Sequence, residues 1–341
     1  MRKERLVREH NKLSTHLYTK QQSLISHFSF LISHSPLIPH SVLILLFFLA
    51  FTFSLHATSV RHTVIPENPR PGEPVTIGIS DAAGARYAVL VVNGRRLAKA
   101  AFFTVPADER PFMAAVLSIP STARQGAAII SIEGDKGVIR EIAITIAERV
   151  FPSEEIHLTP QLSSLRADPN PQRTAESEQL WAILNRTGKE IYGSGSFSPP
   201  VSSTRLTSVY GDRRIYRYSN GTSDTSIHAG VDYGVPTGTD VASCGAGKVV
   251  MARYRIITGY TVIIEHLPGV YSLYYHLDSI AVADGAMVDT GTFLGKSGAT
   301  GLATGPHLHW EIRVSGENTD PDAFISRPIL DKDALFSQIY N

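Results

Sequence analysis

The motif His228-Ala-Gly-Val-Asp232 opens the stretch that decides the fold of this chain, and Gly305-Pro306-His307-Leu308-His309 closes it. Side chains alternate between the two faces of a β-strand, so His307 and His309 project from the same side. The residues that alternate with them are apolar and fill the opposite, buried side: Leu308, Trp310 and Ile312. Imidazoles and a carboxylate in this pattern are typical of a zinc site.

The spacing of His228 and Asp232 allows either a helix or a strand, since both residues of an i, i+4 pair share one helix face. Gly230 lies between them, and apolar and polar residues alternate from Val231 to Tyr233. A loop that runs into a strand therefore fits better than a helix. Catalytic zinc takes three protein ligands and keeps a fourth position for water or substrate. Two imidazoles and one carboxylate would supply those three ligands.

The same stretch carries a third histidine motif, Tyr274-Tyr275-His276-Leu277. With Phe197-Ser-Pro-Pro-Val201 and Thr207–Arg214, the histidine motifs resemble those of lysostaphin/LytM-type zinc metallopeptidases, the M23-like endopeptidases that cut peptide cross-links of bacterial peptidoglycan. The resemblance spans residues from about 190 to 327. It is most specific at the two outer histidine motifs and implies an antiparallel β-sheet domain.

The resemblance also assigns roles. It implies that His228, Asp232 and His309 bind Zn²⁺, and that His276 and His307 do the acid–base work, without saying which of the two is the general base. Imidazoles titrate near neutral pH, as a general base must. Two departures from the family pattern, Cys244 in place of a small alanine and the Leu267-Pro-Gly turn, touch no ligand. We expect His266 to be structural.

The composition is that of an ordinary globular protein of two domains. The chain has 341 residues and a formal net charge of +1, which gives no argument for a nucleic-acid partner. Its one cysteine, Cys244, excludes an intrachain disulfide, and its small apolar neighbours predict a buried free thiol. The residues of Lys296-Ser-Gly-Ala-Thr-Gly301 are typical of a turn. They do not form a nucleotide-binding loop, because no Gly-Lys-Ser/Thr opens a helix there.

Residues 1–59 are expected to direct export. The apolar run Val42–Leu55 suits a signal-peptide core and is short for a membrane span of ~20 residues. Small residues follow at Ala57-Thr58-Ser59, where cleavage could occur. About 40 residues precede the run, which is unusual for a signal peptide. Either translation starts further along the sequence, or the apolar segment is an uncleaved membrane anchor. Both alternatives place the remainder in the periplasm or cell envelope; the second tethers it to the inner membrane, with no other membrane contact.

The rest of the chain divides by composition. Residues 60–150 contain short strand patterns and an Asn93-Gly94 hairpin signal, which indicate an immunoglobulin-like β-sandwich that serves as a spacer or docking module. Residues 151–195 form a proline-rich connector with one expected helix, starting at Thr174 as N-cap and stopping at Gly188. Residues 196–327 are the predicted peptidase domain, and residues 328–341 a C-terminal tail.

These observations predict a mostly β, exported chain in which a C-terminal antiparallel domain follows an immunoglobulin-like sandwich. Its expected activity is zinc-dependent hydrolysis of peptide cross-links in peptidoglycan, with stem or bridge peptides as its partners. One alternative is a non-catalytic LytM-domain regulator that binds wall peptides or activates amidases, which would be expected to lack ligands. A zinc peptidase that acts on a protein is the other.

Overall fold

The computed structural model describes residues 60–341, except residues 81–83, 108–109 and 187. The predicted export segment, residues 1–59, lies outside the described residues. Within the described part of the chain, no helix combines the length and the apolar character needed to cross a membrane. The prediction of a mostly β chain built from antiparallel sheets is confirmed.

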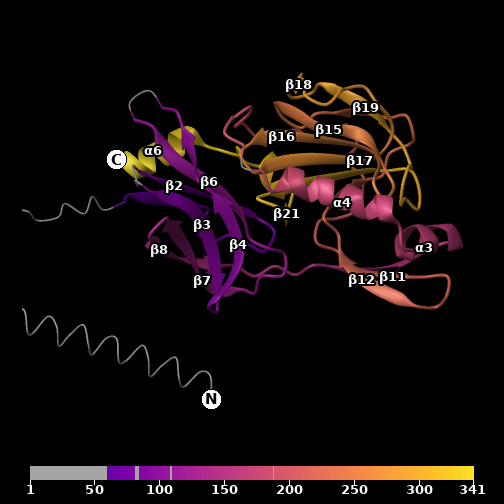
Figure 1. Cartoon of the computed structure of the whole chain (residues 1–341), viewed down its shortest axis with the longest axis horizontal. Helices are drawn as coiled ribbons and strands as arrows, with labels where there is room; N and C mark the ends of the chain where they lie inside the picture. Colours follow the sequence, from indigo (N-terminus) through magenta and orange to yellow (C-terminus); the bar gives the residue numbers. More distant parts are fainter. Residues whose placement is uncertain (1–59, 81–83, 108–109, 187) are drawn as a thin grey trace, which may run out of the picture. The chain divides into compact units, whose positions relative to one another are not determined.

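Two four-stranded antiparallel sheets pack face to face in the N-terminal half (Figure 1). The first sheet has the order β1 (His62–Ile65), β2 (Pro74–Ile79), β6 (Phe112–Ser118), β5 (Phe103–Val105). The second has the order β4 (Arg95–Ala101), β3 (Ala85–Val92), β7 (Gly126–Gly134), β8 (Gly137–Ile146). Alternate residues of both sheets form one core between them, among them Ile77, Leu90 and Ile130.

The predicted hairpin joins β3 to β4. Asn93 and Gly94 both have positive φ angles, 49° and 72°, as the two central residues of a tight β-hairpin turn require. Val92 pairs with Arg95 directly beside the turn.

The connector differs from the prediction, because it contains two helices and a strand. Strand β9 (Ser153–His157) is followed by α3 (Pro160–Ala167) and α4 (Pro171–Leu184). Each helix begins with a proline after a capping side chain, Thr159 or Asn170, so the predicted cap Thr174 lies inside α4. Proline fits the first helical position because the N–H that it lacks would be unpaired there anyway. These prolines start helices and do not break them.

The C-terminal half is built on one large sheet. Its main path has the order β10 (Leu206–Ser208), β13 (Gly230–Tyr233), β20 (Leu308–Val314), β17 (Val270–Ile280), β16 (Gly259–Leu267), β15 (Gly247–Arg255), β18 (Met287–Val288). Strands β14 (Asp240–Ala242), β19 (Phe293–Ser297) and β21 (Glu317–Thr319) join it at the side, and the short helix α5 (Asp322–Ile325) follows. A second, three-stranded sheet has the order β12 (Ser223–Ile227), β11 (Arg213–Arg217), β9.

The two faces of the large sheet carry different side chains. Leu308, Trp310 and Ile312 of β20 are fully buried in the core, as the alternation predicted. His309 projects from the other face and stacks on Tyr275 of β17, at 5.2 Å between ring centroids. Helix α4 packs on this second face over apolar residues of β15 to β17 (Figure 1). Helix α4 therefore covers part of the histidine-bearing face.

The buried Cys244 and His266 agree with the predictions for them. Cys244 is a buried free thiol, and burial raises its pKa to about 12, so it is no nucleophile. His266 is fully buried, with its Nδ1 at 2.7 Å from the Ala246 carbonyl oxygen and its Nε2 at 2.8 Å from Ser272 Oγ. Both residues belong to the core.

The predicted C-terminal tail is a helix that completes the N-terminal sandwich. Helix α6 (Lys332–Tyr340) begins after Asp331, whose side chain accepts a hydrogen bond from the Ala334 N–H. Its buried residues Leu335 and Ile339 lie against β2, so close that a Cβ added to Gly78 would be 2.9 Å from Ile339 Cδ1. A side chain at position 78 would therefore press on Ile339, whose end would have to shift.

We predict that Leu335→Ala lowers the free energy of unfolding by about 2–5 kcal/mol, because Leu335 is fully buried and its loss leaves a cavity. Urea unfolding followed by fluorescence would measure it. Ser337→Ala, on the exposed side of the same helix, is the control and should change stability by less than about 0.5 kcal/mol. Equal effects of the two substitutions would contradict the packing of α6.

Candidate metal centre

Two paired strands and one loop hold the three predicted ligands. Asp232 on β13 lies directly opposite His309 on β20 in the antiparallel register. Residues paired in this way have their Cα atoms about 4.5–5.5 Å apart and point to the same face. His228 lies in the loop just before β13, as predicted, and Gly230 lets the chain enter the strand: a Cβ there would lie 2.2 Å from the Trp310 carbonyl oxygen.

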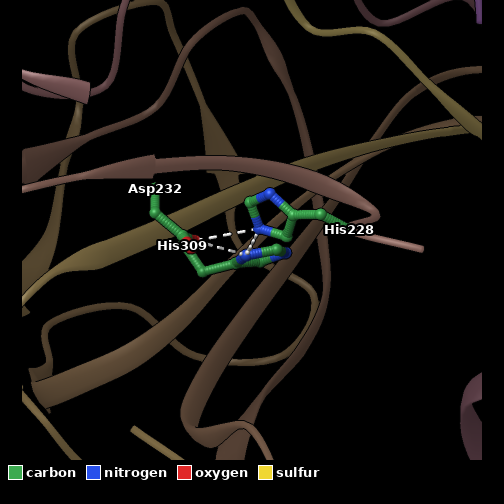
Figure 2. Close-up of side chains that lie close together, drawn as sticks. All are labelled: His228, Asp232 and His309. Atoms are coloured by element: carbon green, nitrogen blue, oxygen red, sulfur yellow. Dashed lines mark hydrogen bonds and ion pairs between the residues drawn. The ribbon is translucent and has the colours of Figure 1, made fainter. Parts of the chain in front are cut away.

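The donor atoms of these residues converge (Figure 2). His309 Nδ1 lies 2.8 Å from Asp232 Oδ1, and His228 Nε2 lies 3.1 Å from the same oxygen and 3.0 Å from His309 Nδ1. All three side chains are buried. Among the described residues, they form the one group of three or more His, Cys, Asp or Glu side chains close enough to share a metal ion.

Further contacts orient both imidazoles toward the cluster. His228 Nδ1 lies 2.7 Å from the Val209 carbonyl oxygen, which can only accept, so Nδ1 carries the hydrogen and Nε2 keeps a lone pair. His309 Nε2 lies 3.4 Å from Glu311 Oε2, which leaves Nδ1 facing Asp232. Hydrogen bonds of this kind fix metal-binding imidazoles in many proteins. Two nitrogens and one carboxylate oxygen therefore meet, a donor set that fits Zn²⁺.

The electrostatics of the cluster also call for a cation. Burial alone would raise the pKa of Asp232, but the facing imidazoles of His228 and His309 hold it well below its usual range. Burial alone would lower the pKa of His309, but Asp232 and Glu311 raise it to about 9. The proton that makes His309 cationic thus lies between the carboxylates of Asp232 and Glu311. A metal ion bound by His309 would take the place of that proton.

The remaining two predicted residues lie beside this cluster. The rings of His276 and His307 are 4.7 Å apart, and His307 Nε2 is 3.8 Å from Asp232 Oδ1. Each Nδ1 lies 2.8 Å from a carbonyl oxygen, Thr300 for His276 and Gly305 for His307. Each Nδ1 therefore donates a hydrogen bond, and each Nε2 can accept a proton. All five predicted site residues come together.

His276 reaches this position through an irregular backbone. Its φ angle is +60°, in the left-handed region that residues with a side chain seldom adopt. The register of β17 shifts around it, with Tyr275 opposite His309 and Leu277 opposite Tyr260. Burial and the neighbouring imidazoles His307 and His309 lower the pKa of His276 to about 3, so the ring is neutral at neutral pH and a weaker base than the near-neutral imidazole expected from the sequence.

Sequence reasoning missed the side chains that surround the cluster. Arg214 of β11 donates a hydrogen bond to Asp232 Oδ2 at 2.7 Å, and the motif comparison gave it no role. Residues of the connector line the cavity above the histidines: Ile156, Leu158 and Leu162. The sequence did contain a signal for Arg214, because two arginines precede the His228 motif in a predicted strand. One sequence cannot show which of them, Arg213 or Arg214, faces the site.

Part of the chain is similar in sequence to known peptidases. Residues 226–321 match the model of peptidase family M23. The DD-carboxypeptidase/endopeptidase Mpg of Neisseria meningitidis is 36% identical over 135 residues, 39% of this chain and 30% of that protein. The peptidoglycan DD-endopeptidase ShyA of Vibrio cholerae is 35% identical over 143 residues, 42% of this chain and 33% of that protein. The matches span about a third of these relatives' lengths.

A solved structure resembles a larger part of the chain. It is that of a Pseudomonas aeruginosa protein assigned to peptidase M23, with a TM-score of 0.53 and 24% sequence identity. The likeness covers 75% of this chain and 94% of the other, and it supports the fold.

We predict that the full chain binds about one zinc ion and that His309→Ala abolishes this binding, because the substitution removes one of three donors. Elemental analysis after dialysis against a zinc buffer would measure it. His276→Ala is the matched control: its ring lies outside the donor set and the variant should keep its zinc. Zinc retained by His309→Ala at the native stoichiometry would exclude this ligand set.

Proposed function

We propose that this chain, whose residues 226–321 match peptidase family M23, is a zinc-dependent endopeptidase that cleaves peptide cross-links of bacterial peptidoglycan. The observation that carries the proposal is the convergence of His228 Nε2, Asp232 Oδ1 and His309 Nδ1 beside two further imidazoles. A regulator that only binds wall peptides would need neither the three converging metal ligands nor the two further imidazoles.

The three converging atoms would hold the zinc ion. When bound there, zinc lowers the pKa of water to about 7 and polarises a carbonyl group, which is the chemistry that peptide hydrolysis requires. Asp232 would offer the ion Oδ1, because Oδ2 accepts the hydrogen bond from Arg214.

His276 and His307 would move the protons. Each imidazole is held by a carbonyl oxygen at Nδ1, so Nε2 is the atom that takes a proton from water. Once protonated, the same Nε2 becomes a donor that can stabilise the developing oxyanion or protonate the departing amine. The close approach of the two rings supports a division of these tasks between them.

The cavity over the histidines favours a substrate with small side chains. Its volume is about 80 Å³, below the ~300 Å³ of a pocket that encloses a small ligand. Groups as small as the side chains of alanine or glycine would suit a cavity of this size, while the rest of the polymer would lie outside. The names of the relatives, DD-endopeptidases, favour a bond between D-amino acids.

The other parts of the chain would support this activity at the cell wall. We infer that the N-terminal sandwich is immunoglobulin-like, because its strand orders correspond to the A-B-E-D and C′-C-F-G sheets of that fold. Its role would be that of a spacer or docking module. The basic and apolar residues before position 60 support export to the periplasm or cell envelope.

We predict that His276→Ala and His307→Ala each lower the turnover number by about 10²–10⁴-fold, as expected for groups in acid–base catalysis. Both variants should retain zinc, so the loss can be assigned to proton transfer. Rates would be measured on a cross-linked muropeptide dimer at saturating concentration. Turnover within threefold of the native value would exclude the residue concerned from acid–base work.

We predict that digestion of purified sacculi by the full chain lowers the fraction of cross-linked muropeptides and exposes new amino groups, without new reducing sugar ends. Chromatography with mass spectrometry of the products would show this, and His309→Ala is the inactive control. New reducing ends without new amines would identify a glycan-cleaving enzyme. No product from a zinc-loaded chain would favour a regulator.

A further inference from the structure

Arg214 lies between the proposed ligand Asp232 and the connector strand β9. Its Nη2 donates to Asp232 Oδ2 at 2.7 Å, and its Nε donates to Glu154 Oε1 at 2.7 Å. The Arg214 side chain is only 13% exposed, that of Asp232 is 9% exposed and that of Glu154 is 35% exposed. One guanidinium therefore joins two carboxylates, one in the metal cluster and one outside it.

The strand pairing explains why Glu154 is in reach. Strand β9 runs parallel to β11, and Glu154 is the partner of Arg214 in the register. The next residue, Glu155, points to the other face of the same strand pair, where it binds Arg217 at 2.6 Å. That second ion pair is exposed and does not take part in the cluster.

The two oxygens of Asp232 have separate partners. Oδ1 faces His228 and His309, whereas Oδ2 faces Arg214. An unheld carboxylate can turn and bind a metal ion through both oxygens. With Oδ2 occupied, Asp232 can give only Oδ1, which preserves an open position on the ion.

We propose that Glu154 and Arg214 are positioning residues that fix Asp232 as a single-oxygen metal ligand, so that the connector strand β9 is part of the metal centre. The inference rests on the proposed zinc site and assigns a role in it to two residues outside the M23-matched region 226–321.

Charge gives Glu154 a second effect. A guanidinium close to a divalent cation repels it, and a carboxylate on the far side of the guanidinium offsets that repulsion. The planar guanidinium with its fixed donors can also serve two carboxylates at once, which a lysine ammonium cannot do in the same geometry. Loss of Glu154 and replacement of Arg214 by lysine should therefore both weaken zinc binding.

The test measures the zinc dissociation constant of the full chain by competition with a chelating dye. Loss of a side chain that hydrogen-bonds to a metal ligand typically lowers the metal affinity 10–100-fold. Glu154→Gln should therefore lower the zinc affinity about 10-fold, and Arg214→Lys at least as much. Glu155→Gln and Arg217→Lys, in the exposed pair on the same two strands, are the matched controls and should stay within twofold.

Cobalt substitution distinguishes positioning from a general loss of structure. The visible absorption of four-coordinate cobalt is stronger than that of five- or six-coordinate cobalt, so a second oxygen from Asp232 weakens it. Glu154→Gln and Arg214→Lys should give weaker cobalt bands than the controls, with an unfolding midpoint of the metal-free chain like the native one. Because Glu154 is partly exposed, Glu154→Gln should fold even if Arg214→Lys does not.

Zinc affinities within twofold of native for Glu154→Gln, with an unchanged cobalt spectrum, would overturn the inference while leaving the zinc peptidase intact. A native chain that binds no zinc would refute the proposed function itself. The two failures are thus separated by the native chain measured beside the variants.

Discussion

The antiparallel pairing of β13 with β20 is the constraint on which the candidate site depends. It puts Asp232 opposite His309, so that the carboxylate and the imidazole meet on one face of the sheet. A shift of one residue would turn His309 into the core and expose Trp310. Because Trp310 is fully buried, the register that satisfies the core is also the register that assembles the ligands.

Other parts of the fold depend on distant segments of the chain. The connector supplies a third strand to the sheet of β11 and β12, and its helix α4 covers part of the face that bears the histidines. The sandwich in turn takes its last packing element from α6. The proposed division at residues 151–195 therefore separates elements that share sheets and cores.

The sequence predicted the features that depend on local pattern. Alternation identified β20 and its buried face, Asn93-Gly94 identified a hairpin, and the resemblance of the histidine motifs to M23-like peptidases pointed to the five candidate site residues. The backbone of His276 could not be foreseen, since its positive φ comes from a register shift that requires three strands to be in place. Pairing of Glu154 with Arg214 joins residues 60 positions apart, and no local pattern links them. Proline at a helix start and proline in a loop also look alike until the capping residue is known.

The position of α6 has a consequence for biosynthesis. A chain that emerges from the ribosome or a translocation channel exposes β1 and β2 long before residues 332–340 follow. Until then, the surface around Gly78 lacks the apolar side chains of Leu335 and Ile339 that cover it. The sandwich is consequently completed only after the whole peptidase-like region has emerged, and a chaperone that shields exposed apolar surface would act on the sandwich during that interval.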